Sequence, residues 1–230
     1  MRSLLRTTDR RLLRDVGLVC LADGVIGASF GAVTVAGGLP WWVPVVMSLA
    51  VFAGAAQFSA VGVAMAGGGP FAAVSTGLLL NTRTVPFSLA VADVLGSRRL
   101  TQLIGAHLIT DETAAFALAQ PDRATRRRAF WVSGIGLYLA WNACTLAGAL
   151  LGQAIGDTDA FGLDAAFPAV LLALVMPALR DAATRNAALL GAAIAVLTTP
   201  FLPPGTPVLL ALLGLFAARR APRGGQGRPA

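Results

Sequence analysis

Apolar segments follow one another almost without interruption from residue 16 to residue 218, and this pattern restricts the fold more than any other feature of the sequence. A helix rises 1.5 Å per residue, so about 20 apolar residues are enough to cross the hydrocarbon core of a bilayer. Only 13% of the 230 residues are charged, whereas a soluble domain carries about 25%. The sequence therefore predicts an all-α fold, a polytopic integral membrane helix bundle with about eight membrane segments.

The distribution of charge predicts the orientation of this bundle. The formal net charge of +7 would by itself suit a nucleic-acid-binding protein. The arginines, however, cluster at the two ends of the chain and in short connectors, as they do in the cytoplasmic flanks of membrane spans. We therefore expect two cytoplasmic termini and no nucleic acid partner. Three parts are expected: a basic cytoplasmic N-terminus (1–15), a transmembrane transport domain (16–218) and a disordered basic cytoplasmic tail (219–230).

The first expected span, 16–39, carries residues that bear on packing and on polarity. Gly27 and Gly31 form a small-xxx-small pair, which lets a neighbouring helix approach closely. Asp23 lies one to two turns inside the span, and we interpret it as an interfacial carboxylate that reaches headgroup water. The later segments are expected at 42–66, 71–95, 101–120, 130–155, 167–179, 186–202 and 207–218.

Two of these segments, 71–95 and 101–120, carry polar residues near their middle, and two arrangements stay open for both. Each is either one kinked span or a pair of half-helices, which would meet near 81–83 and near 110–112. If both cross the membrane, the arginines at 98 and 99 lie outside. If both are re-entrant, every Arg-rich connector lies inside, as the positive-inside bias favours. The length of 71–95 favours a crossing instead, and the two halves of the chain show no internal repeat.

Polar side chains inside the apolar segments are the candidate functional residues. An Arg or Asp near the centre of a span costs about 2.5–3.5 kcal/mol on insertion scales, so such residues commonly mark a substrate or ion path. Gln57 lies in mid-span and either lines a substrate cavity or holds helices together. His107, four residues before Asp111, is expected to be hydrogen bonded. The other candidates are Asn81, Arg83, Asp111, Glu112 and a stripe of Tyr138, Trp141 and Asn142 on one helix face.

Several motifs follow one another in the order seen in one known family. They are FAGAAQF at 52–58, Asn81-Thr82-Arg83, Thr110-Asp111-Glu112, Trp141 with Thr145, and GLDAAFPA at 162–169. From about residue 14 to residue 215 the chain resembles the AzlC family, the large subunits of bacterial branched-chain amino acid exporters. The resemblance implies a permease of the bacterial inner membrane that exports leucine, isoleucine, valine or methionine. It also implies a small membrane partner subunit of the AzlD type.

Two positions depart from the pattern of that family. The family usually has an Asn-x-Arg-His motif, and Thr84 stands in place of the His. Asp23 stands where the first span of the family often has a Pro. A proton-transfer role of the missing His is therefore not carried over to this chain, and the substrate preference can differ.

The energy source follows from what the sequence lacks. It has no nucleophile–base pair and no metal-ligand cluster, and its Gly-rich runs at 37–38 and 67–69 lack the Lys-Ser/Thr of a nucleotide-binding loop. We therefore expect no enzyme activity and no cofactor, and we expect the proton gradient to drive export. Asp111 and Glu112 are the proton-coupling candidates, because a low-dielectric site favours the protonated form of a carboxylate.

The mechanism expected from these residues centres on Arg83. It contacts the substrate carboxylate, or it pairs with Asp111 or Glu112 between transport steps. Half-helix N-termini near Asn81 or Thr110 would bind the same carboxylate. The substrate-binding candidates are Gln57, Asn81, Arg83, Tyr138, Trp141 and Asn142. The alternatives are a fixed buried salt bridge that only holds broken helices together, an uncoupled channel, and a structural or accessory membrane subunit.

Overall fold

The computed structural model describes residues 2–154, 172, 176, 178–202 and 206–215. These residues form helices and no strand, in agreement with the predicted all-α fold. The motif at 162–169, most of the segment expected at 167–179 and the tail at 219–230 lie outside the described residues.

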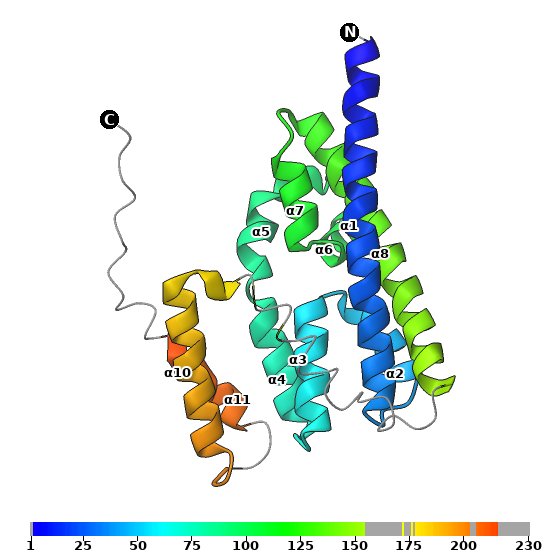
Figure 1. Ribbon diagram of the computed structural model, residues 1–230. Helices are drawn as coiled ribbons and strands as arrows, with labels where there is room; N and C mark the ends of the chain where they lie inside the picture. The colour runs from blue at the N-terminus through cyan, green and yellow to red at the C-terminus, as the bar shows by residue number, and fades with distance from the viewer. Residues whose placement is uncertain (1, 155–171, 173–175, 177, 203–205, 216–230) are drawn as a thin grey trace, which may run out of the picture.

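Two long helices, α1 (Arg2–Ala36) and α8 (Arg123–Ala154), lie side by side and form the frame of the molecule (Figure 1). Within the described part of the chain, 10–36 and 123–154 are the helical stretches long and apolar enough to cross a membrane. The two helices run parallel, because positions further along α1 meet positions further along α8. Gly24 lies against Cys144, and Gly152 lies against the backbone of Ala32.

Small residues bring the backbones of α1 and α8 into contact, so the close approach predicted at Gly27 and Gly31 is confirmed. A Cβ atom built on Gly31 would overlap the carbonyl oxygen of Thr145, and one built on Gly27 would lie 3.0 Å from the carbonyl oxygen of Trp141. From the other side, a Cβ atom on Gly148 would overlap the backbone of α1. At Gly31 and Gly148 the two helices therefore pack through backbone atoms, as small residues permit in membrane helices.

The segment expected as one span at 42–66 is instead a hairpin of two short helices, α2 (Trp42–Val51) and α3 (Gly54–Met65). The chain reverses at Phe52, whose φ of 37° lies in the left-handed region. Both helices lie in the half of the molecule where α1 ends, so the chain enters and leaves this hairpin at the same end (Figure 1). The prediction of a continuous span is wrong because apolar residues flank the reversal on both sides, which hides it from hydropathy.

The next segment is a kinked pair of helices, α4 (Pro70–Asn81) and α5 (Thr84–Ala90). The two residues between these helices keep right-handed helical angles, so the chain continues toward the opposite end of the molecule (Figure 1). At the kink, the Thr84 hydroxyl donates a 2.7 Å hydrogen bond to the carbonyl oxygen of Asn81. This bond satisfies a carbonyl group that the interruption leaves without a helical partner. Of the two arrangements open for 71–95, the structure has the kinked one.

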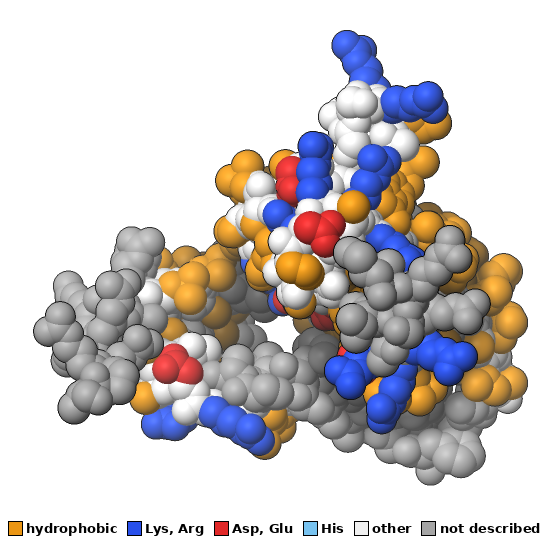
Figure 2. All heavy atoms as spheres, turned by 90° about the horizontal axis from the view of Figure 1, so that it is seen from above, with side chains coloured by type: hydrophobic (Ala, Val, Ile, Leu, Met, Phe, Trp, Pro, Cys, Tyr) orange, Lys and Arg blue, Asp and Glu red, His pale blue; other side chains and the backbone are white. Residues whose placement is uncertain are grey.

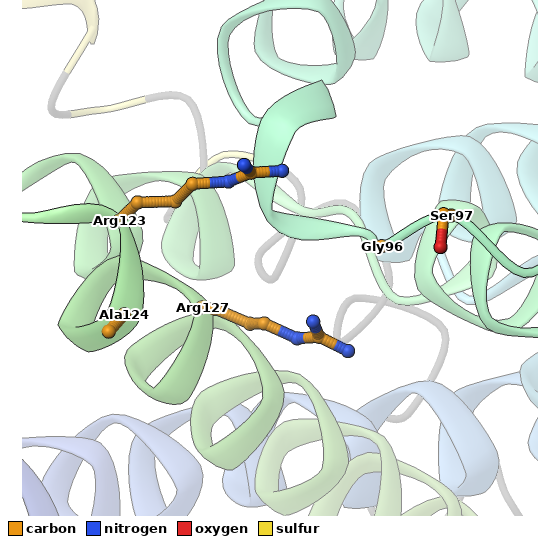
Figure 3. Close-up of a pocket in the computed structure, with 5 residues that line it drawn as sticks. All are labelled: Gly96, Ser97, Arg123, Ala124 and Arg127. Atoms are coloured by element: carbon orange, nitrogen blue, oxygen red, sulfur yellow. The ribbon is translucent and has the colours of Figure 1, made fainter.

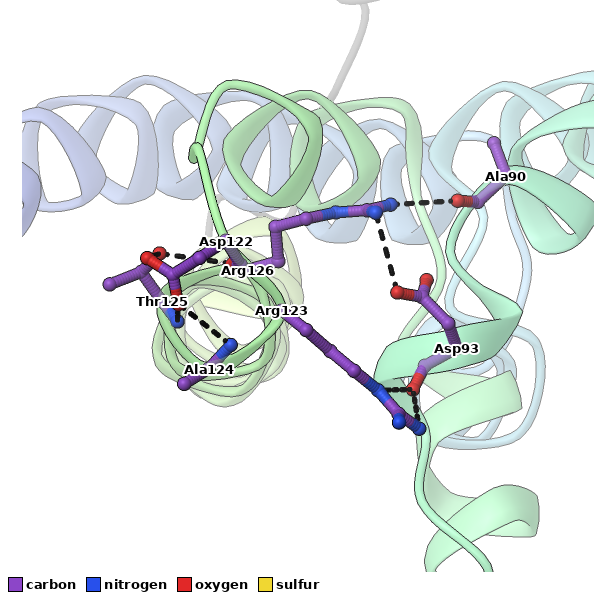
Figure 4. A network of polar contacts seen from close by, with 7 residues as sticks. All are labelled: Ala90, Asp93, Asp122, Arg123, Ala124, Thr125 and Arg126. Atoms are coloured by element: carbon purple, nitrogen blue, oxygen red, sulfur yellow. Dashed lines mark hydrogen bonds and ion pairs between the residues drawn. The ribbon is translucent and has the colours of Figure 1, made fainter.

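Arginines of α8 bind backbone and side-chain groups at the C-terminal end of α5 (Figure 4). After α5 the chain forms a 3₁₀ turn, η1 (Ala92–Val94). Arg123 donates hydrogen bonds of 3.1 and 2.9 Å to the carbonyl oxygen of Asp93. Arg126 donates a 3.0 Å hydrogen bond to the carbonyl oxygen of Ala90 and pairs with the Asp93 carboxylate at 3.3 Å. Cationic side chains thus satisfy carbonyl groups at the C-terminal end of a helix, where they are favoured.

A second hairpin, α6 (Arg99–His107) and α7 (Asp111–Leu118), is the re-entrant arrangement left open for 101–120. It enters from the end where α8 begins, opposite to the first hairpin (Figure 1). The tips of the two hairpins meet in the middle of the molecule, where the rings of Phe52 and His107 lie 6.2 Å apart. The arginines at 98 and 99 therefore lie at the same end as those at the starts of α1 and α8.

The last described helices are η3 (Ala178–Arg180), α10 (Ala182–Thr198), α11 (Thr206–Leu210) and η4 (Ala211–Gly214). α10 begins before the expected residue 186, because the Asp181 carboxylate caps it by accepting hydrogen bonds from the amide and hydroxyl of Thr184, both 2.8 Å. These bonds lower the pKa of that carboxyl, the amide contributing most. The described part of the segment expected at 207–218 forms short helices, so the number of membrane segments stays a prediction.

Contact between the backbones of α1 and α8 predicts opposite effects for one substitution at two glycines of α1. We expect Gly31→Ala to lower the free energy of unfolding by about 1–3 kcal/mol, because the new methyl group has to separate the helices. We expect Gly17→Ala to leave it unchanged or to raise it by up to about 1 kcal/mol, because no atom lies within 4 Å of that position. Unfolding in mixed detergent micelles measures both values, and equal effects would contradict the contact.

Candidate functional site

A cavity of about 480 Å³ lies where the two hairpin tips meet the kink between α4 and α5. Residues of α1 and α8 close it on the side of the long helices. It is lined by Asp23, Ile26, Phe52, Ala53, Gly54, Ala55, Ala56, Phe58, Leu80, Asn81, Arg83, Thr84, Ile109, Thr110, Asp111, Glu112 and Trp141. We call it the central cavity. Five of the eight residues predicted from the sequence line it, namely Asn81, Arg83, Asp111, Glu112 and Trp141.

The N-termini of two helices face the central cavity. α3 begins at Gly54, and no side-chain cap satisfies the first amide groups of this helix. α7 begins at Asp111, after Thr110, which forms a capping box with Thr113. Helix N-termini carry a partial positive charge and free amide groups, so they favour an anion. The N-terminus expected near Thr110 is present, and near Asn81, the last residue of α4, the short helix α5 begins at Thr84.

The charged side chains of the cavity are one guanidinium and three carboxylates. Arg83 and Asp111 form an ion pair at 3.5 Å, with 53% and 41% of their side chains exposed. The expected pairing of Arg83 with an acid of 110–112 is therefore present. A pair this exposed has little binding energy to hold helices together, and this argues against the alternative of a fixed buried salt bridge. Glu112 and Asp23 supply the other two carboxylates.

Asp23 is the functional candidate that the sequence reading missed. We interpreted it as an interfacial carboxylate in contact with headgroup water, but it lines the central cavity and is only partly exposed. The structure places Asp23 in the cavity wall because α1 passes beside the hairpin tips there. The signal was available in the sequence, since an Asp one to two turns inside an apolar helix is costly unless a polar cavity receives it.

Trp141 forms the wall of the cavity next to the N-terminus of α3. A Cβ atom built on Gly54 would lie 2.8 Å from the Cη2 atom of the Trp141 ring, so only glycine leaves room for the indole there. The indole N–H donates a 3.1 Å hydrogen bond to the Oε1 atom of Gln57. The ring also stacks on Phe30 with the centroids 6.3 Å apart, which fixes its orientation.

Gln57, Tyr138 and Asn142, predicted as substrate-binding, are not among the residues that line the central cavity. Gln57 is fully buried, and its side-chain amide donates a 3.0 Å hydrogen bond to the carbonyl oxygen of Met47. Asn142 accepts a 2.7 Å hydrogen bond from the Ser48 hydroxyl and donates one of 2.8 Å to the carbonyl oxygen of Tyr138. These side chains join α2 and α3 to α8, so their placement supports the structural alternative left open for Gln57.

His107 and Tyr138 contact the same carbonyl oxygen near the end of α2. The Nε2 atom of His107 lies 2.9 Å from the carbonyl oxygen of Leu49, and the Tyr138 hydroxyl donates to the same oxygen at 3.2 Å. This carbonyl group is one of those that the end of α2 leaves without a helical partner. The expectation of a hydrogen-bonded His107 is confirmed. In the described part of the chain, no group of three His, Cys, Asp or Glu residues is arranged to hold a metal ion.

The structure thus defines a helical membrane protein with a charged cavity between helix breaks. A family profile described as "AzlC protein" matches residues 19–155. Two relatives from Helicobacter pylori, strains 26695 and J99, are both described as "Uncharacterized membrane protein"; each is 28% identical over 176 residues, 75% of this chain and 76% of the relative. No solved structure matches the chain. The chain belongs to the AzlC family, a family of membrane transport proteins.

Because two donors share one carbonyl oxygen, we predict that their removal is not additive. His107→Phe and Tyr138→Phe each leave Leu49 with one donor, so each should cost little. The double variant leaves the Leu49 carbonyl group without either donor at the end of α2 and should lower the free energy of unfolding by about 1 kcal/mol more than the sum of the single changes. A double-mutant cycle in mixed micelles measures this coupling. Additive losses would show that the two bonds do not serve the same group.

Proposed function

We propose that this protein is an inner-membrane secondary transporter subunit that exports branched-chain amino acids, and methionine, together with a small AzlD-type subunit, and that the proton gradient drives this export. The observation that carries the proposal is the central cavity, in which Arg83, three carboxylates and an uncapped helix N-terminus face one space. These groups lie at the depth where the helices are interrupted, as substrate sites of secondary transporters do.

The chemistry of the cavity matches a zwitterionic amino acid. The substrate carboxylate suits the guanidinium of Arg83 and the first amides of α3, because both favour an anion. The ammonium group suits Asp23 and Glu112. Ile26, Phe52, Phe58, Leu80 and Ile109 are apolar lining residues that would receive an aliphatic side chain. A substrate with opposite charges at one end and a hydrocarbon group at the other fits this distribution.

Proton coupling is assigned to Asp111 and Glu112, with Asp23 as a third candidate. With one Arg and three carboxylates, the cavity carries an excess of negative charge when every acid is ionised. Protons and the ammonium group of the substrate compete for such a site, since each neutralises a carboxylate. Binding of a proton from outside would then release the amino acid, which is the exchange that export against a gradient requires.

The orientation and assembly belong to the same proposal. Both termini are cytoplasmic, and the end of the molecule with the arginines at the starts of α1, α6 and α8 faces the cytoplasm, as the positive-inside rule predicts. About eight membrane segments, some of them broken, complete the bundle. The AzlD-type partner is proposed from family membership alone, and no contact within this chain is used to support it.

Export by reconstituted protein tests the roles of the charged residues. We expect Glu112→Gln, Asp23→Asn and Arg83→Gln each to slow efflux of radiolabelled leucine from proteoliposomes about tenfold to a hundredfold, the cost of one charge-assisted hydrogen bond of about 1.5–3 kcal/mol. Asp15→Asn is the matched control, because Asp15 is an exposed carboxylate of α1 outside the cavity. Wild-type rates in Glu112→Gln and Arg83→Gln would end the proposal.

The pH gradient separates a coupled exporter from the alternatives. We expect wild-type efflux to accelerate when the proton gradient is imposed, and we expect Glu112→Gln to lose this response, because a neutral amide binds no proton at neutral pH. The assay is run with and without the small partner subunit. Flux that ignores the gradient would identify an uncoupled channel. Transport that depends on the partner but tolerates every cavity variant would identify an accessory subunit.

A further inference from the structure

A second cleft, separate from the central cavity, opens at the end of the molecule where α8 begins. It has a volume of about 520 Å³ and is lined by Gly96, Ser97, Arg123, Ala124 and Arg127 (Figure 3). The two arginines are one helical turn apart on α8 and extend from the same side of that helix toward the turn before α6. Figure 2 looks onto this end of the molecule and shows that arginine side chains gather on it.

The positive charge of this cleft is not neutralised by the acids beside it. Arg127 has neither a hydrogen bond nor an ion pair with any described residue. Arg123 is bound to a neutral carbonyl oxygen, which leaves its charge uncompensated. The Asp93 carboxylate is paired with Arg126. Asp122 lies on the other side of α8, where it caps the helix by accepting hydrogen bonds from Ala124 and Thr125 (Figure 4).

The turn that forms the opposite wall is shaped by Gly96. Its φ of +94° is a conformation that other residues rarely adopt, and a Cβ atom there would lie 3.3 Å from a terminal nitrogen of Arg127. The glycine therefore leaves space in front of the guanidinium. Arg98 and Arg99 follow directly in the chain and are exposed, which adds positive charge at the mouth of the cleft.

A separate apolar groove lies between α6 and α8, about two helical turns further along α8 from Arg127. It has a volume of about 450 Å³, and its exposed lining includes Leu103, Ile135 and Leu139. On α8, Arg127, Trp131, Ile135 and Leu139 are four residues apart in succession, so one face of the helix leads from the cleft into the groove. The lining of the groove contains no Asp, Glu or Arg. The basic cleft and the apolar groove thus lie on one side of the molecule.

We propose that this side of the protein binds an anionic phospholipid, whose phosphate lies between Arg127 and Arg123 while an acyl chain lies in the groove between α6 and α8. Guanidinium groups bind phosphate oxygens in the bidentate manner that favours Arg at such sites. Basic pockets between membrane helices on the cytoplasmic side are suited to acidic headgroups. The occupant is amphipathic because the cleft and the groove differ in polarity, and it is anionic because Arg127 has no protein counter-ion among the described residues.

Lipid titration of the purified full-length chain tests this site. The detergent-solubilised, delipidated protein is titrated with phosphatidylglycerol, with phosphatidylcholine of the same acyl chains, and with inorganic phosphate, and lipid binding and the melting temperature are measured. We expect phosphatidylglycerol to bind and to raise the melting temperature more than either other probe. Arg127→Gln should weaken phosphatidylglycerol binding about fivefold, since one arginine near a headgroup contributes about 1 kcal/mol.

Two further variants separate a local site from general charge attraction. Arg11→Gln removes one exposed arginine from the same end of the molecule, outside the cleft, and should leave lipid binding unchanged. Leu103→Gln changes a side chain that is 70% exposed, so the fold should tolerate it while the groove loses affinity for the acyl chain.

Each contrary result overturns the proposal. Equal binding of the two lipids would indicate an ordinary lipid annulus. An effect of Arg11→Gln as large as that of Arg127→Gln would indicate unspecific attraction. Stabilisation by inorganic phosphate as large as that by phosphatidylglycerol would indicate a free-anion site. Absence of phosphatidylglycerol binding would contradict the proposal and would indicate that a protein partner covers the groove.

Discussion

A helix that stops inside an apolar interior leaves backbone groups without partners, and the arrangement of this protein depends on how those groups are satisfied. At the end of α2, the carbonyl oxygen of Leu49 accepts hydrogen bonds from α6 and from α8. At the kink of α4 and α5, Thr84 supplies the hydrogen bond. At the tip of the second hairpin, the Thr113 hydroxyl donates to the carbonyl oxygen of Leu108. Many polar side chains in the apolar segments therefore form hydrogen bonds with backbone groups at the helix breaks and are not available to a ligand.

The central cavity contains the polar groups that remain once the breaks are satisfied. The first amides of α3 have no side-chain cap, and the carboxylates of Asp23 and Glu112 face the same space. Arg83 and Asp111 pair across it while staying accessible to solvent. Water-accessible charge at the depth of the helix breaks distinguishes this cavity from the buried contacts around it, such as the one between Gln57 and Trp141. The same breaks thus create both the need for structural hydrogen bonds and the polar site.

How much the sequence predicts depends on whether the determining contact is local. Composition gives the helical membrane class, and the spacing of Gly27 and Gly31 gives the close helix pair, because both follow from the chain itself. The cost of charge in an apolar segment marks Arg83, Asp111 and Glu112 correctly as residues of one cavity. The reversal at Phe52 is invisible, since contacts from α6 and α8, distant in sequence, decide it. The hydrogen-bond partners of Gln57 and Asn142 are hidden from the sequence for the same reason, because they come from other helices.

The contact between the backbones of α1 and α8 has a mechanical consequence. Packed helices slide past one another when the side chains between them change rotamer, and at Gly31 and Gly148 no side chain lies between the two backbones. We therefore expect α1 and α8 to move together as one rigid body. The two hairpins that meet at the central cavity enter from opposite ends and consist of short helices, and they lie outside this backbone contact.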